Sequence, residues 1–441
     1  MCDTFVALPA HTADNSVIFG KNSDREANEA QSLEFHQART GIKEKTIQCT
    51  YISVPQVKET FATLISRPFW MWGAEMGANE KSVVIGNEAV FSWIKPEKTG
   101  VLTGMDLIRL ALERAPTAEN ALEIIIALIH DHGQGGIGGY EDKNMAYNNS
   151  FLIADNREAW ILEVVGHLWA AKKVNGYYAI SNGLTIGQEF DRSHPELIEF
   201  ARKKGKLKKG ETFNFARCYS DWFYTTFSAC RKRQNRSSVL LHNQSGSYTL
   251  RDAFNHLRDH GTEDYRPDNH FLGNRICAHA ANSLSRNAMQ TTGSFIAHLT
   301  KEANTFWATG TAAPCLSLFK PMRFVDKVIP AIVGTPGPGY DPDTLWWHHE
   351  RLHRTVLYDF HTRSEPFLTE RDKTEQKWKE LSEKVKDANF YRELTEPAFN
   401  EESDLTDKWY NAINKLPVNR KPYGYYRKYR RKLNRKAGMI F

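Results

Sequence analysis

The first 25 residues constrain the fold most strongly, because two short apolar runs there enclose a polar segment. Residues 2–8 and 16–20 are rich in strand-forming side chains, and the residues between them have turn chemistry. This pattern predicts a β-hairpin whose first strand begins at Cys2. A polar cluster at residues 21–25 follows the second run, and antiparallel pairing is expected to return it to the start of the chain.

Cysteine at position two gives this hairpin a nucleophile. Methionine aminopeptidase removes Met1 readily when the next side chain is small, so the mature chain is expected to begin with Cys2. An α-amino group has a pKa of about 8 and a free thiol one of about 8.5, so the amine can act as base for the thiol of its own residue. The alternative is that Cys2 follows the start codon by accident and has no role.

The cysteine spacing argues against two common site types and for a reducing compartment. The six cysteines form no C-x-x-C pair, which disfavours zinc-ribbon and thioredoxin-like sites. Neither a signal-peptide pattern nor an apolar run of about 18 residues occurs, so we expect a cytoplasmic protein without a membrane span. The cysteines are Cys2, Cys49, Cys218, Cys230, Cys277 and Cys315.

Charge is unevenly distributed along the 441 residues. Ten Lys or Arg and no acidic residue lie between residues 415 and 436, and without them the net charge of +6 becomes −4. Interleaved tyrosines, such as Tyr425 and Tyr429, would allow this tail to touch nucleic acid or acidic lipid. A basic tail on a mildly acidic body is more typical of a solvated terminus, so a nucleic-acid partner is not favoured.

Strand-like and helix-like segments come in blocks, which favours an α+β fold over a doubly wound sheet. Helical spacing predicts one helix over 103–114 and another after Thr117 to about His130, and residues 150–181 read as a β-meander. The predicted organisation is a main domain over 2–365, a charged helical extension over 366–414 and a basic, Tyr-containing tail over 415–441.

The segment from His349 to His353 reads H-E-x-x-H, the pattern in which two histidines one helical turn apart bind zinc and Glu350 acts as base. Its flanking residues Trp346, Trp347 and Arg354 instead suit an ion-paired packing helix. No third-ligand extension follows, although Glu365 or Glu370 could be proposed. We therefore expect no metal and no cofactor, with a zinc hydrolase as the remaining alternative.

Many further segments occur in a fixed order along the chain. They include C-D-T-F-V-A-L, F-G-K-N-S-D-R, G-A-N-E-K-S-V-V-I-G-N-E, H-G-Q-G-G, A-I-S-N-G-L-T-I, F-S-A-C-R and L-W-W-H-H-E-R-L-H-R. In these segments, from residue 2 to about residue 355, the chain resembles the secernins and related cysteine dipeptidases, within the N-terminal nucleophile (Ntn) hydrolases. The resemblance implies a four-layer αββα sandwich of two antiparallel sheets flanked by helices, with the nucleophile at the start of a central strand.

The same resemblance, extended to the bile salt hydrolases and penicillin V acylases, implies a set of site residues. An arginine of those enzymes is replaced here by Lys21, which keeps the charge but loses the bidentate fork. The implied catalytic residues are Cys2, Asp24, Asn182 and Arg231, and the implied substrate or oxyanion residues are Lys21 and Asn87.

The resemblance implies a cysteine amidohydrolase that cleaves dipeptides or similar small amides through a thioester on Cys2. Its expected partner is a small peptide or acyl-amide substrate, and a homo-oligomer is expected. A catalytically silent, secernin-like binding or regulatory protein is the alternative within the same fold. The zinc hydrolase based on His349, Glu350 and His353 is the alternative outside it.

Overall fold

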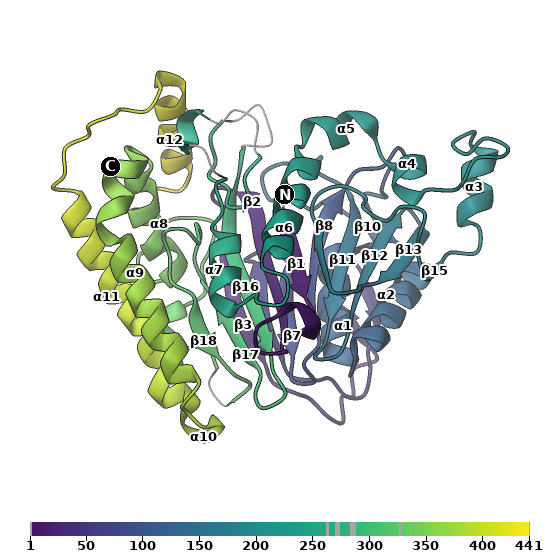
Figure 1. Cartoon of the computed structure of the whole chain (residues 1–441), viewed down its shortest axis with the longest axis horizontal. Coiled ribbons are helices and arrows are strands. Elements are labelled where there is room, and N and C mark those ends of the chain that lie inside the picture. Colours follow the sequence, from purple (N-terminus) through teal and green to yellow (C-terminus); the bar gives the residue numbers. More distant parts are fainter. Residues whose placement is uncertain (1, 262–263, 270–273, 283–287, 326–327, 441) are drawn as a thin grey trace.

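Two antiparallel β-sheets stacked face to face lie at the centre of the molecule, with helices on both outer faces (Figure 1). The computed structural model describes residues 2–261, 264–269, 274–282, 288–325 and 328–440. The first sheet has the strand order β14-β1-β2-β16-β17-β18. Its strands are β1 (Asp3–Ala7), β2 (Val17–Glu26), β14 (Tyr177–Ile180), β16 (Met289–Leu299), β17 (Thr305–Ala308) and β18 (Lys320–Met322).

The second sheet has the order β15-β13-β12-β11-β8-β7-β6-β3. Its strands are β3 (Gln31–His36), β6 (Thr63–Pro68), β7 (Met76–Asn79), β8 (Val84–Val90), β11 (Asn148–Ala154), β12 (Ala159–Val165), β13 (Leu168–Lys173) and β15 (Arg192–Ser193). Two small ribbons pair β4 (Thr46–Gln48) with β5 (Ser53–Pro55), and β9 (Leu102–Thr103) with β10 (Gln134–Gly135).

Helices α1 (Gly104–Arg114) and α2 (Ala118–His132) cover the outer face of the second sheet. Helices α6 (Cys230–Asn243), α7 (Leu250–Leu257) and α9 (Phe360–Ser382) cover the first. The remaining α-helices are α3 (Leu197–Lys203), α4 (Phe215–Tyr219), α5 (Trp222–Phe227), α8 (Leu345–Val356), α10 (Asp387–Phe390), α11 (Glu396–Ile413) and α12 (Gly424–Lys436).

Three apolar layers hold this sandwich together, and the side-chain alternation of a strand explains how one strand serves two of them. Val6 on β1 joins the layer between the two sheets, whereas its neighbour Phe5 packs toward α7 and Phe254. A third layer lies between the second sheet and the first two helices, and it contains Ile153 of β11 and Ile125 of α2. The expected α+β fold with four αββα layers is therefore confirmed.

The predicted N-terminal hairpin is confirmed, since β1 begins at Asp3 and pairs with β2. The polar cluster at 21–25 was expected after the second strand, and the structure corrects this. β2 continues to Glu26, because β1 flanks it on one side and β16 on the other and together they satisfy its backbone. Lys21 and Asp24 are thus buried strand residues and not turn residues.

The predicted β-meander is correct for three strands and wrong for the fourth. β11, β12 and β13 pair in sequence, but the Asn175–Gly176 turn sends the chain across to the other sheet, where β14 pairs with β1. The two predicted helices are confirmed as α1 and α2, with Thr103 and Thr117 as their N-caps.

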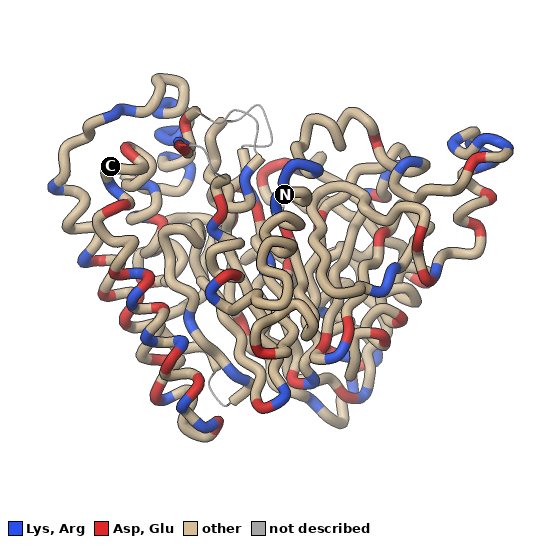
Figure 2. The backbone as a smooth tube through the Cα atoms, in the orientation of Figure 1, with Lys and Arg blue, Asp and Glu red and all other residues tan. Residues whose placement is uncertain are grey.

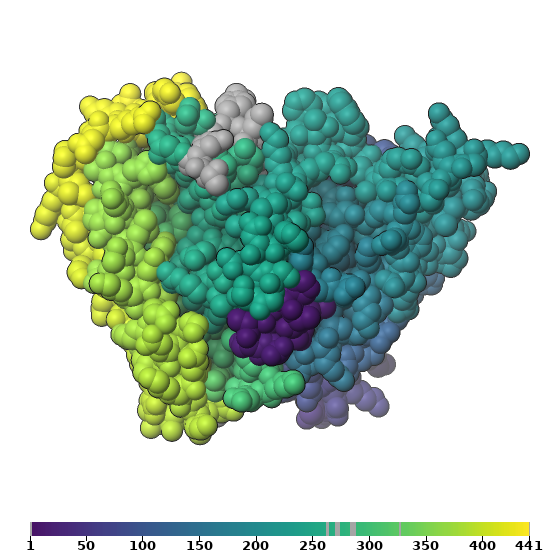
Figure 3. Space-filling model, in the orientation of Figure 1, coloured from purple at the N-terminus to yellow at the C-terminus, as the bar shows by residue number. Residues whose placement is uncertain are grey.

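The C-terminal third completes the sandwich. The expected boundary at 365/366 falls inside α9, and Trp378 of that helix packs in the same apolar layer as Phe5. Figure 2 shows acidic and basic residues alternating along α9 and α11, and Figure 3 shows the C-terminal residues (yellow-green) on the left flank of the molecule. Part of the basic tail is docked as α12, where Tyr426 and Arg430 are buried.

Across the described part of the chain, none of the helices combines the length and the apolar character that crossing a membrane requires.

Candidate active site

Cys2 lies immediately before β1, which is an inner strand of the first sheet between β14 and β2, and the Cys2 side chain is buried. The backbone N–H of Asp24 on the neighbouring strand donates to the Cys2 sulfur at 3.3 Å. The thiol opens into a narrow pocket lined by four carboxylates, one guanidinium, an asparagine and several apolar groups. The lining residues are Cys2, Asp24, Arg25, Glu26, Glu29, Glu75, Asn87, Ala89, Gly138, Gly139, Met145, Tyr147 and Met289.

A buried charge network lies beneath the thiol. The Lys21 ammonium donates to the backbone carbonyl of Asn87 at 2.5 Å and lies 3.5 Å from Glu75 and 3.7 Å from Glu88. Burial favours the neutral amine and lowers the pKa of Lys21, but the ionisable neighbours Cys2, Glu88 and Glu75 raise it by more, so the amine stays cationic. Lys21 therefore places a fixed positive charge below the nucleophile.

Glu75 connects this cation to the thiol and to a second cation. The Cys2 sulfur lies 3.7 Å from its carboxylate, and Arg25 donates to it at 2.9 Å. Burial opposes ionisation, but the Arg25 and Lys21 cations lower the pKa of Glu75. The carboxylate is therefore charged at neutral pH and holds both cations in place.

Burial raises the pKa of the Cys2 thiol to about 11, and the Lys21 cation opposes this rise. The thiol is consequently protonated at neutral pH in this environment. A nucleophilic attack by its sulfur must therefore transfer the proton to a base.

Asp24 is fixed by its neighbour on the next strand. Thr291 on β16, which pairs with Asp24 in register, donates its hydroxyl to the Asp24 carboxylate at 2.7 Å. The side chain is buried, so this predicted site residue does lie beside Cys2. Its backbone N–H contacts the sulfur, while its carboxylate is held toward β16.

Asn182 is connected to Cys2 through Arg233, a residue that the sequence analysis did not select. The Arg233 guanidinium donates to the Cys2 carbonyl at 3.1 Å and to the Asn182 side-chain oxygen at 2.8 Å, and it also binds Asp3. The Asn182 amide nitrogen donates to the Ala89 carbonyl at 2.9 Å. Asn182 is therefore a buried brace between Arg233 and β8, and it is absent from the pocket lining.

Arg231, which was expected among the catalytic residues, does not line the pocket at Cys2. Its side chain is exposed and lines a different hollow, together with Asn214 and Gln234. On α6, Cys230 and Arg233 share the buried face, whereas Arg231 turns to solvent. The helical spacing of Cys230, Arg233, Ser237 and Leu241 is the sequence signal that would have selected Arg233.

Asn87 does line the pocket, but the side-chain atom that has no hydrogen-bond partner is its oxygen, which is an acceptor. Its amide nitrogen already donates to Asn149 at 3.1 Å and contacts the Met105 sulfur. Its side-chain oxygen and one carboxylate oxygen of Glu29 are buried without a hydrogen-bond partner among the described residues. Two residues of the pocket lining therefore each carry a buried acceptor oxygen without a hydrogen-bond partner in the part of the chain that the structure describes.

The H-E-x-x-H segment forms part of α8 and not a zincin site. Glu350 accepts from His353 at 2.5 Å and from Arg354 at 2.6 Å, which makes it a buried ion-pair partner. Neither ring nitrogen of His349 has a hydrogen-bond partner within the described ranges. Among these ranges the three side chains do not form a converging ligand set.

Two comparisons connect this geometry to known proteins. The sequence model of peptidase family C69 matches residues 10–234, which is just over half of the chain. This match agrees with the resemblance to the cysteine dipeptidases and includes most of the residues that surround the pocket.

Several solved structures are similar to the chain at low identity. Penicillin V acylase from Agrobacterium tumefaciens is 10% identical, covers 74% of this chain and 87% of its own, and gives a TM-score of 0.44. A mutant of conjugated bile acid hydrolase from Clostridium perfringens is 14% identical. The match covers 73% of this chain and 92% of that one, with a TM-score of 0.44. The N-acylethanolamine-hydrolyzing acid amidase ortholog of Caenorhabditis elegans is 11% identical, with 67% and 92% covered and a TM-score of 0.32.

Replacing Glu88 by Gln tests the buried charge network through pH. Burial raises the pKa of Glu88 to about 8, above the ordinary value of 4.5, so between these pH values the folded state holds a proton that the unfolded state releases. The stability that wild type gains from Glu88 should therefore decline as pH rises from about 4.5 to about 8. Urea unfolding at several pH values should show Glu88→Gln gaining stability relative to wild type over this range. An unchanged difference would contradict the assignment, and the exposed Glu97→Gln is the control.

The neighbouring arginines of α6 provide a matched pair of substitutions. Arg233→Ala leaves the buried carboxylate of Asp3 without this cation, and loss of one partner of a buried pair costs about 3–5 kcal/mol. Arg231→Ala removes an exposed side chain and should change the unfolding free energy by less than about 0.5 kcal/mol. Chemical denaturation of both variants measures this difference, and equal losses would refute the placement of Arg233.

Proposed function

The chain belongs to peptidase family C69, and from that premise we propose that it is a cysteine amidohydrolase that cleaves dipeptides, with Cys2 as its nucleophile. The observation that carries the proposal is the position of the Cys2 thiol. It is held at the start of β1 between the Asp24 N–H and the charge pair of Lys21 and Glu75, at the base of a pocket.

The base in this proposal is the α-amino group that removal of Met1 would expose on Cys2. The thiol gives its proton to this amine as the sulfur attacks the amide carbonyl and forms the carbon–sulfur bond. The Lys21 cation and the Asp24 N–H stabilise negative charge on the sulfur. Burial raises the pKa of the thiol, so its sulfur needs a base to accept the proton, and the α-amine of the same residue would supply one.

The second half of the reaction returns the proton. The protonated amine gives it to the leaving nitrogen as the carbon–nitrogen bond breaks, which leaves an acyl group on the Cys2 sulfur as a thioester. Water then attacks the thioester, releases the carboxylic acid and restores the thiol. Arg233 acts in this scheme by position, since it holds the carbonyl of Cys2 and therefore the orientation of both reacting groups.

The pocket chemistry favours a substrate with a free amino terminus. Glu29 and Asn87 each present a buried, unsatisfied oxygen, and Glu26 adds a further carboxylate to the lining. Such acceptors suit an ammonium group with its three N–H donors. A fatty acyl group has no N–H or O–H donor along its chain, so these oxygens support a dipeptide over a fatty acyl amide.

Substitution of the nucleophile tests the proposal directly. Cys2→Ala should lower dipeptide hydrolysis by about 10⁴-fold or more, because loss of a covalent nucleophile leaves only binding and charge stabilisation. The matched control Cys218→Ala alters a buried cysteine in the inter-sheet core and should keep wild-type turnover per folded molecule. Intact mass spectrometry of wild type should show that Met1 is absent.

Two results would contradict this mechanism. One is full hydrolysis by Cys2→Ala, and the other is an active protein that retains Met1. A Met1-free protein that turns over no member of a broad dipeptide and acyl-amide panel would instead favour the binding or regulatory alternative.

Blocking the substrate amine tests the assigned acceptors. Wild type should cleave dipeptides with a free α-amine at least about 10-fold more efficiently in kcat/KM than their N-acetylated forms, because the buried acceptors lose a charged hydrogen-bond donor. Glu29→Gln should reduce this preference. Equal efficiency toward free and acetylated substrates would contradict the dipeptide assignment while leaving Cys2 as the nucleophile.

A further inference from the structure

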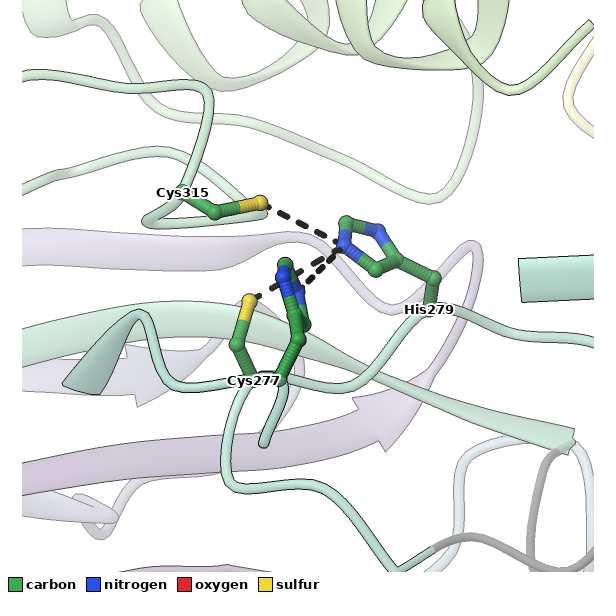
Figure 4. A group of neighbouring side chains, drawn as sticks. Cys277, His279 and Cys315 are labelled. Atoms are coloured by element: carbon green, nitrogen blue, oxygen red, sulfur yellow. Dashed lines mark hydrogen bonds between the residues drawn. The ribbon is translucent and has the colours of Figure 1, made fainter. Parts of the chain in front are cut away.

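Four side chains converge at a place that the proposed reaction does not use. His260, Cys277, His279 and Cys315 each present one ligand atom, and these four atoms all lie within 4.8 Å of one another. Figure 4 shows Cys277, His279 and Cys315 pointing toward a common centre. Three of the four residues are buried and His260 is half-buried.

The separations are close to those of a tetrahedral zinc site. The His279 Nε2 atom lies 3.3 Å from the Cys315 sulfur, 3.9 Å from the Cys277 sulfur and 3.2 Å from the Nε2 atom of His260. Zinc bonds of about 2.3 Å to sulfur and about 2.0 Å to nitrogen place tetrahedral ligand atoms roughly 3.3–3.8 Å apart. The three separations from His279 Nε2 are therefore close to those that the ion would impose, and the remaining pairs of ligand atoms lie within 4.8 Å.

Hydrogen bonds alone cannot satisfy this arrangement. A ring nitrogen of a neutral imidazole either donates one proton or accepts with one lone pair, yet Nε2 of His279 faces three polar atoms at once. A cation at the centre would accept a lone pair from each of the four ligands. A hydrogen bond from Nε2 of His279 therefore serves at most one of these three contacts, whereas a central ion would account for all of them.

The other nitrogen of His279 is held by the H-E-x-x-H helix. Nδ1 of His279 lies 2.9 Å from Nε2 of His353, and Nδ1 of His353 lies 2.5 Å from Glu350. Because the Glu350 carboxylate accepts, His353 donates to it and can accept from His279 through its other nitrogen. This chain leaves the lone pair of His279 Nε2 directed at the cluster, as metal-binding histidines require.

We propose that His260, Cys277, His279 and Cys315 bind a structural zinc ion. Two thiolates and two imidazoles form a closed ligand set, which leaves no position for water or substrate and so excludes a catalytic role for the ion. Tyr265 stacks on His260 with ring centroids 4.2 Å apart, and Phe360 meets His279 edge-on at 5.4 Å. These rings orient the histidines and shield the site.

The ion would connect the loop that carries Cys277 and His279 to the loop that carries Cys315, and both loops lie beside β16. Thr291 receives the backbone N–H of Ala278, between two of the ligands, and its carbonyl accepts from Ala313, near the third. The same Thr291 hydroxyl donates to Asp24, next to Cys2. Zinc would therefore stabilise the part of β16 that positions Asp24. This inference does not depend on whether the proposed hydrolysis is correct.

Metal analysis of the full-length protein is the first test. Wild type expressed with zinc should retain about one zinc ion per chain after gel filtration, and cobalt in its place should give the absorption of a tetrahedral thiolate site. Cys277→Ser and Cys315→Ser should lose the zinc, whereas Cys49→Ser, a buried cysteine outside the cluster, should keep it. His353→Ala should weaken zinc binding about 10–100-fold, since it removes the residue behind His279.

A second measurement needs no variant and decides the matter if the serine variants do not fold. Native wild type is treated with N-ethylmaleimide before and after zinc removal by EDTA, and each modified cysteine is located by peptide mass spectrometry. Chelation should speed the labelling of Cys277 and Cys315 but not of Cys218. Absence of zinc from wild type, equal zinc in the serine variants and wild type, labelling rates that EDTA does not change, or a Cys277–Cys315 disulfide would each overturn the proposal.

Discussion

The burial of the Lys21 ammonium between the two sheets is the interaction on which the rest of the structure depends. A fully buried cation is tolerable only where an anion and polar oxygens surround it, and here the Glu75 carboxylate, the Glu88 carboxyl and the Asn87 carbonyl do so. These three groups belong to the second sheet or its approach, whereas Lys21 belongs to the first. Their pairing therefore fixes how the sheets face each other and where Cys2 lies.

Local sequence patterns were sufficient for the parts of the fold that local physics determines. The hairpin at Cys2, the capped helices after Thr103 and Thr117 and the αββα class all followed from spacing, caps and resemblance. Cys2 and Asp24 could be placed together because antiparallel pairing converts sequence distance into proximity. For the hairpin and the two capped helices, the neighbouring residues in sequence carry enough of the interaction energy to decide the structure, whereas the αββα class rested on the resemblance.

Contacts between distant segments decided the rest, and the sequence signal for them was weak or misleading. Residues 21–25 look like a turn because the strand β16 that buries them lies about 270 residues further on. Glu75 gave no local signal, since its partners are Lys21 and Arg25. Arg233 was separable from Arg231 only through the buried face of α6, and the basic run around both residues concealed that spacing.

The H-E-x-x-H segment shows how a motif can be real in sequence and different in role. Its Glu350 and His353 are buried and ion-paired, as a scaffold helix requires, yet the same two residues fix the tautomer of His279 at the inferred zinc site. The absence of C-x-x-C pairs argued against a zinc ribbon, but Cys277 and His279 stand one residue apart and Cys315 joins them only through the fold. Because Thr291 bonds both to the loop of Cys277 and to Asp24, that cluster and the nucleophile are braced by one strand, β16. A disturbance of either should therefore reach the other through β16, without any shared ligand or substrate.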